Sequence, residues 1–297
     1  MNRQKFTGSA LLLIGAIIWG VAFVAQAKAS NIGAFTFNCV RNIIGGVVLL
    51  PFIFVLCKKD NDQPPRPKNC PNLFICGAIC GFFLAVASAF QQSAINMGAS
   101  TGKAGFITAC YIIFVPLIST FFGKKVSFLL WIAVALSTAG LYLLCMTESL
   151  VLEISDLLLL ACAISFAFQI LAIDRFSPYF SGIKLACVQF FACGLFSGIM
   201  MLIFEKPNLS EIYAAGIPIL YTGVFSSGVA YTLQIVGQKK LNPTVATLIM
   251  SLESAIAAIS GWFILNQSMR PEEIIGCVIM FVAIVIAQLP TEMFKRK

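Results

Sequence analysis

Apolar stretches recur along the whole chain, and only short breaks that are polar or contain Pro or Gly separate them. A helix needs roughly 20 mostly apolar residues to cross the hydrocarbon core of a bilayer, which is about 30 Å thick. The stretches are long enough for this, so the chain is predicted to be an all-α integral membrane protein. Its ten predicted transmembrane helices span approximately residues 7–27, 33–57, 71–95, 101–122, 127–147, 156–173, 182–204, 214–236, 243–264 and 272–290.

The composition excludes a soluble globular protein. Of the 297 residues, 59% are hydrophobic and 11% are charged, whereas soluble domains contain roughly 45–50% and 25%. The mean hydropathy of +0.94 also shows that the apolar residues are not confined to a single anchor. The one long polar connection, residues 58–70, contains Pro64, Pro65 and Pro67 and is predicted to be a linker.

The basic residues predict the orientation of the chain in the membrane. Segments that face the cytoplasm are usually richer in Lys and Arg than segments that face outward. If the N-terminus is cytoplasmic, fifteen basic residues lie inside and four outside, which predicts a multi-pass plasma or inner membrane protein with both termini in the cytoplasm. The fifteen are Arg3, Lys5, Lys58, Lys59, Arg66, Lys68, Lys124, Lys125, Arg175, Lys184, Lys239, Lys240, Lys295, Arg296 and Lys297, and the four are Lys28, Lys103, Lys206 and Arg270.

The two halves of the chain resemble each other. Shifting the third and fourth predicted helices by 142 positions aligns them without a gap on the eighth and ninth. Because each half has an odd number of helices, the second half enters the membrane upside down relative to the first. We therefore predict two inverted five-helix repeats, at 1–147 and 148–291, followed by a basic cytoplasmic tail at 292–297. The matched pairs are Gly81 with Gly223, Phe83 with Phe225, Gln92 with Gln234, Ala104 with Ala246, Ile107 with Ile249 and Phe121 with Phe263.

Short motifs spread over almost the whole chain suggest a family. They are Trp19-Gly20, Arg41, residues 102–106, residues 111–116, Asp174-Arg175, Ala230-Tyr231 and Ser251-Leu252-Glu253. With these motifs the chain resembles the ten-helix EamA-type branch of the drug/metabolite transporter superfamily. The resemblance implies export or uptake of amino acids, related metabolites or drugs, with export favoured. Ser254 departs from the family pattern, where a proline usually follows the glutamate and kinks the helix.

Two ionisable residues lie deep within predicted helices, where a charge costs about 2.5–3.5 kcal/mol on insertion scales. Glu253 lies 11 residues past Asn242, and Arg41 lies 8 residues past Gly33. At 1.5 Å per residue these positions are roughly 16 Å from the inner surface and 12 Å from the outer surface, so their depths nearly coincide. Glu253 is predicted to carry a proton or a cationic substrate group, and Arg41 to hold a carboxylate. Alternatively, the two form a buried ion pair, or a protonated Glu253 bonds to neighbouring helices, and either arrangement only fixes packing.

Neutral polar side chains at similar depth are candidates for substrate contact. An amide, indole or phenol that faces lipid would leave its hydrogen-bonding capacity unmet, so these side chains should point into the bundle. Hydrogen bonds between packed helices use the same residue types, which is the structural alternative. The predicted substrate-binding residues are, besides Arg41 and Glu253, Trp19, Gln92, Tyr111, Tyr231 and Gln234.

Other kinds of chemistry lack their usual residues. The chain has no histidine, the commonest proton shuttle and metal ligand, and we expect no catalytic residue, metal site or cofactor. We therefore predict a secondary transporter that moves a small polar metabolite or a drug-like compound by alternating access, with proton coupling through Glu253. One alternative is a membrane-embedded enzyme that acts on a lipid or prenyl substrate. Another is a sensor or scaffold that transports nothing.

The predicted partners follow from the same reasoning. They are the lipid bilayer and a small-molecule substrate, and a second copy of the chain in a homodimer is left open. The net charge of +8 is spread over helix ends and does not form a phosphate-binding face, so no nucleic-acid partner is expected.

Overall fold

The computed structural model describes residues 3–56, 64–145, 153–265 and 271–288. These residues form helices joined by turns, and they contain no strand. The predicted basic tail lies outside the described residues. The helices are α1 (Arg3–Lys28), α2 (Ala34–Leu56), α3 (Leu73–Asn96), α4 (Thr101–Ala109), α5 (Tyr111–Phe121), α6 (Phe128–Cys145), α7 (Ile154–Phe176), η2 (Ser177–Tyr179), α8 (Gly182–Phe204), α9 (Leu209–Ala214), α10 (Gly216–Tyr221), η3 (Thr222–Tyr231), α11 (Thr232–Gln238), α12 (Pro243–Met250), α13 (Leu252–Leu265) and α14 (Pro271–Gln288).

The predicted all-α fold of ten transmembrane helices is confirmed. Within the described ranges, eight helical spans are long and apolar enough to cross a membrane, and two shorter apolar helices, Phe128–Leu143 and Ile274–Ala287, complete the ten. One predicted span, 182–204, coincides with α8, and α1 begins four residues before the predicted start.

Two spans that were predicted to be continuous are broken near their centres. Residues 101–122 form α4 and α5, with the break at Cys110, and residues 243–264 form α12 and α13, with the break at Ser251. When Cys110 is shifted by the 142 residues of the sequence repeat, it falls on Leu252, one residue from the break at Ser251. At each break the ψ angle lies near zero, −8° and −13° respectively, so the backbone leaves the regular α-helical conformation.

Serine hydroxyl groups bond the backbone around the second break. The Ser251 hydroxyl donates to the carbonyl of Leu248 at 2.8 Å, and the Ser254 hydroxyl donates to the carbonyl of Ser251 at 2.6 Å. Such side-chain bonds compete with the helical ladder and often bend helices. The helix is therefore interrupted even though Ser254 replaces the proline that the family resemblance implies at this position.

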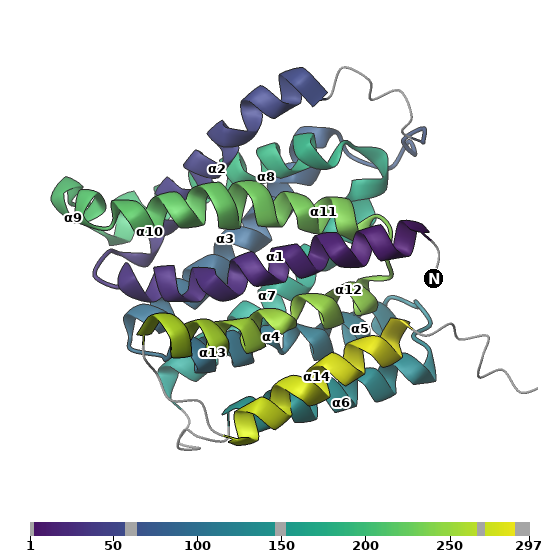
Figure 1. Cartoon of the computed structure of the whole chain (residues 1–297). Helices are drawn as coiled ribbons and strands as arrows, with labels where there is room; N and C mark the ends of the chain where they lie inside the picture. The colour runs from purple at the N-terminus through teal and green to yellow at the C-terminus, as the bar shows by residue number, and fades with distance from the viewer. Residues whose placement is uncertain (1–2, 57–63, 146–152, 266–270, 289–297) are drawn as a thin grey trace, which may run out of the picture.

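Helices of one half pack mainly against helices of the other half. The most extensive contacts join α2 with α8, α3 with α7 and α8, α1 with α13, and α6 with α14. The last pair lies side by side at one edge of the bundle in Figure 1. The two halves therefore interlock.

Two glycines that the sequence repeat relates make equivalent contacts. A Cβ atom on Gly81 of α3 would lie 2.5 Å from the carbonyl oxygen of Gln189 on α8. A Cβ atom on Gly223 of η3 would lie 3.0 Å from the carbonyl oxygen of Arg41 on α2. Each glycine thus lets two helices of different halves approach closely, and the second contact is at the candidate site residue Arg41.

The N-terminus of α2, which carries Arg41, is held by a carboxylate from the far half of the chain. Glu205, just past the end of α8, accepts hydrogen bonds from the backbone N–H groups of Phe35 at 2.9 Å and Thr36 at 2.8 Å. The Thr36 hydroxyl donates to it at 2.7 Å. A carboxylate here satisfies free helix N–H groups and interacts favourably with the helix dipole. This fixes one end of α2 relative to α8.

Candidate functional site

A buried cavity lies at the centre of the bundle, between the two halves. Its volume is about 40 Å³, on a scale where one water needs roughly 10–15 Å³, so it has room for about three waters. The lining is mixed, with charged, amide, hydroxyl and aromatic groups. The lining residues are Trp19, Ala22, Phe23, Gln26, Arg41, Gln91, Thr108, Tyr111, Phe166, Gln169, Ile170, Ser226, Tyr231, Gln234, Met250 and Glu253.

Glu253 and Tyr111 form the centre of this lining. Glu253 is 6% exposed and lies in the first turn of α13, just past the break at Ser251, whereas Tyr111 begins α5 just past the break at Cys110. The Tyr111 hydroxyl donates to a carboxylate oxygen of Glu253 at 2.9 Å. The two positions differ by 142, which is the shift that relates the two halves. The hydrogen bond therefore joins equivalent positions and lies at the pseudo-two-fold axis.

Arg41 is a buried cation, and the ion pairs among the described residues do not include it. It is 3% exposed, and its Nε atom has no hydrogen-bond partner among the described residues. Its guanidinium carbon lies 5.4 Å from the centroid of the Phe37 ring. Arg41 and Glu253 line the same cavity, but the ion pairs of the described residues do not include one between them. The side chains of Arg41 and Glu253 can therefore each interact with a molecule bound in the cavity.

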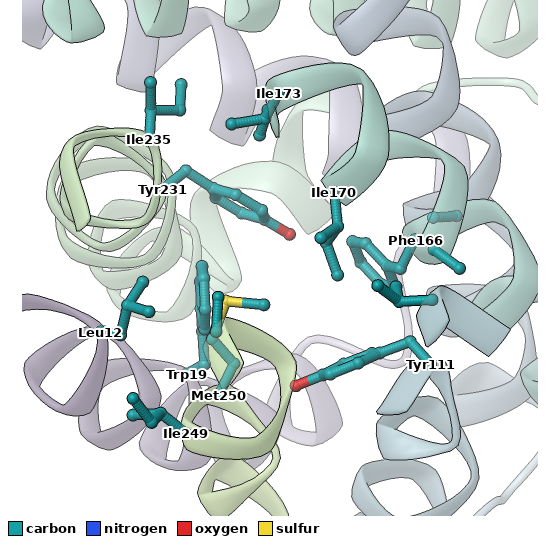
Figure 2. Packing of buried hydrophobic residues seen from close by; sticks show 14 of the residues in the cluster. Leu12, Trp19, Tyr111, Phe166, Ile170, Ile173, Tyr231, Ile235, Ile249 and Met250 are labelled. Carbon is teal, nitrogen blue, oxygen red and sulfur yellow. The ribbon is translucent and has the colours of Figure 1, made fainter. Parts of the chain in front are cut away.

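Aromatic rings form one wall of the cavity. The rings of Trp19 and Tyr231 meet edge to face, with centroids 4.8 Å apart. In Figure 2 the hydroxyl groups of Tyr111 and Tyr231 point into the same space, with Trp19 and Met250 on one side of it. Phe166 lies on the other side. Two phenol groups therefore face this space.

Amide side chains join three helices at the cavity. Gln234 of α11 donates to Gln169 of α7 at 3.3 Å, and Gln169 donates to Gln189 of α8 at 3.3 Å. Elsewhere in the lining, Gln91 of α3 donates to the Thr108 hydroxyl at 3.2 Å. The Oε1 atom of Gln234 and the Nε2 atom of Gln189 keep no partner among the described residues. The amide chain thus retains both acceptor and donor capacity.

Toward the bundle end where α1 begins, buried apolar side chains of the core lie beside the cavity, and we call them the apolar barrier. It consists of four buried side chains from α1, α7, α11 and α12, namely Leu12, Ile173, Ile235 and Ile249. A second apolar cluster lies toward the opposite end, where α1 ends and α2 begins, and includes Phe23, Ala94, Ile95, Ala104 and Leu159. The sequence repeat matches Ile249 of the apolar barrier with Ile107, which packs against the second cluster.

Six of the seven predicted site residues line the cavity, and one does not. Gln92 lies outside the lining and donates instead to the Gln26 carbonyl at 3.3 Å and to Asn96 at 2.9 Å. Asn96 in turn donates to the Ile32 carbonyl at 2.7 Å. Gln92 therefore ties α3 to the end of α1, which is the structural alternative for such residues. Substrate contact by the other six stays a prediction.

Some lining residues are not predictable from the sequence. Phe166, Ile170 and Met250 are ordinary apolar residues of membrane helices, and nothing in their sequence context distinguishes an inward-facing one. Ser226 lies in η3, which is a π-helix. π-Helical turns often occur at functional sites and change which residues face inward, so a regular 3.6-residue period does not predict it.

A polar cavity between two inverted halves of a ten-helix membrane protein is the architecture of a membrane transporter. The comparisons agree, because the chain belongs to the EamA-like transporter family, whose sequence profile matches residues 6–146 and 153–288. The predicted family resemblance is confirmed. Family membership also indicates a protein that transports and is not an enzyme.

Similar proteins carry transporter names over nearly their whole length. An uncharacterized transporter of Archaeoglobus fulgidus is 28% identical over 284 residues, which cover 94% of this chain and 84% of the relative. An uncharacterized inner membrane transporter of Escherichia coli K12, YedA, is 25% identical over 95% of this chain and 90% of its own. A crystal structure of a protein at 16% identity matches 97% of this chain with a TM-score of 0.77, which supports the fold.

Proposed function

We propose that this protein is a secondary transporter that moves a small metabolite with a carboxylate group, such as an amino acid, by alternating access. The observation that carries the proposal is that Arg41 and Glu253 line one buried cavity without pairing with each other. A buried charge without a partner is costly. A substrate carboxylate at Arg41 would supply the missing counter-charge through charge-assisted hydrogen bonds.

The other lining residues have roles that follow from their chemistry. Glu253 accepts the ammonium group of a zwitterionic substrate or carries a proton. The free Oε1 atom of Gln234 accepts a hydrogen bond from the substrate. Trp19 and Tyr231 form an aromatic surface for its apolar part.

The transport cycle requires the cavity to widen. A volume of about 40 Å³ holds about three waters, which is less than an amino acid needs. In the proposed cycle the apolar barrier and the second apolar cluster separate in turn, so that the cavity opens to one side and then to the other. Interlocked halves that rock about a shared axis open the two ends alternately.

Proton coupling is the second part of the proposal. Glu253 is the one acidic residue of the lining, and Tyr111 donates to its carboxylate. Because the pair lies at the pseudo-two-fold axis, Glu253 is at the same depth for both sides of the membrane. A proton taken up from one side is then released to the other. We propose export, with both termini in the cytoplasm, and support the orientation by the distribution of the basic residues.

The test is transport by the purified full chain in proteoliposomes. Labelled amino acids and related carboxylates are presented with and without a proton gradient. We expect concentrative transport of at least one of them that needs the gradient, and dissipation of the gradient should stop it. Failure across a broad panel of solutes in both directions would overturn the transport proposal.

A variant separates coupling from binding. Glu253→Gln keeps a side-chain oxygen that accepts from Tyr111 but cannot release a proton at neutral pH. We expect it to lose gradient-driven accumulation while it retains substrate exchange. Glu211→Gln, which changes an exposed carboxylate of α9, is the control and should behave as the parent chain. Full gradient-driven accumulation by Glu253→Gln would exclude Glu253 as the proton carrier.

A further inference from the structure

A second cavity lies apart from the central one, between α3, α8 and the start of α2, and shares no lining residue with it. Its volume is about 280 Å³, seven times that of the central cavity on the same scale. The lining is apolar except for the hydroxyl of Ser197. The lining residues are Phe35, Phe82, Ala85, Val86, Ala89, Phe90, Phe196, Ser197 and Met200.

The cavity exists because α3 and α8 touch at one end and separate toward the other. At Gly77 and Gly81 the helices are so close that an added Cβ would lie 2.4 Å from Val188 and 2.5 Å from the Gln189 carbonyl. One and two turns further along, α3 presents the small residues Ala85 and Ala89 where α8 has moved away. The gap is therefore a consequence of the glycine contact.

The mouth of the cavity is continuous with the surface that faces lipid. Phe82 is 46% exposed and Met200 is 36% exposed. The neighbouring residues of α8 on the same surface, Leu195, Ile199 and Ile203, are exposed large hydrophobics. In a chain that spans the bilayer, the medium at this mouth is hydrocarbon.

The depth of the cavity corresponds to one leaflet. Met200 lies four residues before the end of α8, and Ala85 lies 11 residues before the end of α3. At 1.5 Å per residue these two residues lie about 6 Å and about 16 Å below the helix ends, and Phe82, nearer the start of α3, lies about 21 Å below. One leaflet contributes about 15 Å of hydrocarbon. A chain that enters from the boundary would reach the midplane along this path.

We propose that this cavity binds one acyl chain of a membrane lipid from the leaflet where α1 ends and α2 begins. Water is excluded as the occupant because an ordered water needs two to four polar partners, and the lining offers one hydroxyl. An empty cavity of this size would lose the dispersion contacts of its walls. The bound chain fills the space between α3 of one half and α8 of the other, so it acts as a wedge between the halves.

The experiment uses the full chain in vesicles that contain a phospholipid with a photoactivatable diazirine near the middle of one acyl chain. After irradiation, the adducts are mapped by mass spectrometry. We expect adducts to concentrate on residues 82–90 and 196–200 above the level on other lipid-facing helices. Even labelling of all lipid-facing surfaces would overturn the proposal.

Variants keep the test specific. Ala89→Phe fills the cavity and should lower labelling of these two segments by about tenfold or more, as overpacking excludes a ligand. Ile199→Phe adds a ring to an exposed position that does not line the cavity and should leave labelling unchanged. Met200→Ala enlarges the mouth and should keep or raise labelling, which provides a second variant if Ala89→Phe does not fold.

One further outcome would assign the cavity to another ligand. If an uncharged hydrophobic compound abolishes labelling of the two segments but not of the rest of the surface, at concentrations far below those of the lipid, the cavity is a drug site and the acyl-chain proposal is wrong. The readout is binding and does not require transport. Its result is therefore independent of the function proposed above.

Discussion

At the scale of single residues, replacing Arg41 distinguishes a role in substrate binding from a role in helix packing. A charged pair that only fixes packing loses stability when one partner is removed, since the other charge is left buried. Arg41 has no such partner among the residues that the structure describes. Its removal therefore relieves a cost and leaves no opposite charge stranded.

We accordingly predict that Arg41→Gln weakens substrate binding without lowering stability. KM should rise about tenfold to a hundredfold, because a hydrogen bond to a charged group contributes about 1.5–3 kcal/mol. The melting temperature of the purified protein should stay equal or increase. Arg175→Gln, at an exposed arginine near the end of α7, is the control for both measurements. A lower melting temperature with an unchanged KM would assign Arg41 a structural role.

Glu205 caps the N-terminus of α2. Its carboxylate satisfies two backbone N–H groups and a hydroxyl at the start of α2. A Cβ on Gly33 would lie 2.3 Å from this carboxylate, so the close contact also requires glycine at that position. Neither residue attracts notice in the sequence, because they lie far apart in it.

We predict that Glu205→Ala destabilises the protein by about 1–3 kcal/mol, as expected for loss of a charged helix cap. Gly33→Ala should have a similar effect, because the added methyl group displaces the carboxylate. The exposed carboxylate Glu211 provides a control, and its replacement by Ala should change stability by less than about 0.5 kcal/mol. Chemical or thermal unfolding in detergent measures the difference. Equal stability of Glu205→Ala and Glu211→Ala would contradict the capping role.

At the scale of helices, η3 links the two halves at the candidate site. It carries Ser226 and Tyr231 into the cavity lining and packs against α2. Two of its glycines have different surroundings. A Cβ on Gly223 would lie 2.8 Å from the Ile44 side chain, whereas a Cβ on Gly228 would meet nothing closer than 3.5 Å.

These glycines form a matched pair for a test. We predict that Gly223→Ala destabilises the protein by about 1–3 kcal/mol through overpacking, and slows transport because it displaces the backbone of Arg41. Gly228→Ala should be almost neutral, since the new methyl group makes ordinary contacts. Both changes alter helix propensity in the same way, so the difference in melting temperature and in transport rate isolates the contact. If both substitutions had similar effects, the change in helix propensity, and not the contact of Gly223 with α2, would explain them.

The helices also show which features a sequence can and cannot predict. Depth follows from counting residues along a helix, which is why Arg41 and Glu253 were found. The face of a helix does not follow from depth, since adjacent residues point about 100° apart. Gln91 lines the cavity, whereas its neighbour Gln92 binds the end of α1. The breaks at Cys110 and Ser251 and the π-helical η3 change the helical phase locally, and a regular period does not reveal them.

At the scale of the whole molecule, the interlocked halves determine how the protein assembles. The sequence repeat and the odd number of helices predicted the inversion. They do not predict that each half packs mainly against helices of the other half. The contacts of α2 with α8 and of α3 with α7 are examples. A half alone would leave these faces without their partners. The protein therefore resembles a dimer whose subunits are joined in one chain.

This arrangement predicts that the chain tolerates a cut between the halves but that neither half is stable alone. We would express residues 1–147 and 148–297 as separate polypeptides, singly and together. Singly, each should aggregate or be degraded, because lipid does not replace the close contacts of Gly81 with Gln189 and of Gly223 with Arg41. Together, they should copurify and show a melting transition near that of the intact chain.

The matched control is coexpression of two differently tagged copies of residues 1–147. These copies insert in the same orientation, so they lack the inverted partner and should not copurify. The second half, by contrast, must insert with its N-terminus outside. Its basic residues, among them Arg175, Lys184, Lys239 and Lys240, favour that orientation by the same charge bias that orients the whole chain. A half that purifies alone with a cooperative melting transition would show that its stability comes from contacts within one repeat, and that the halves are separable domains rather than interlocked partners.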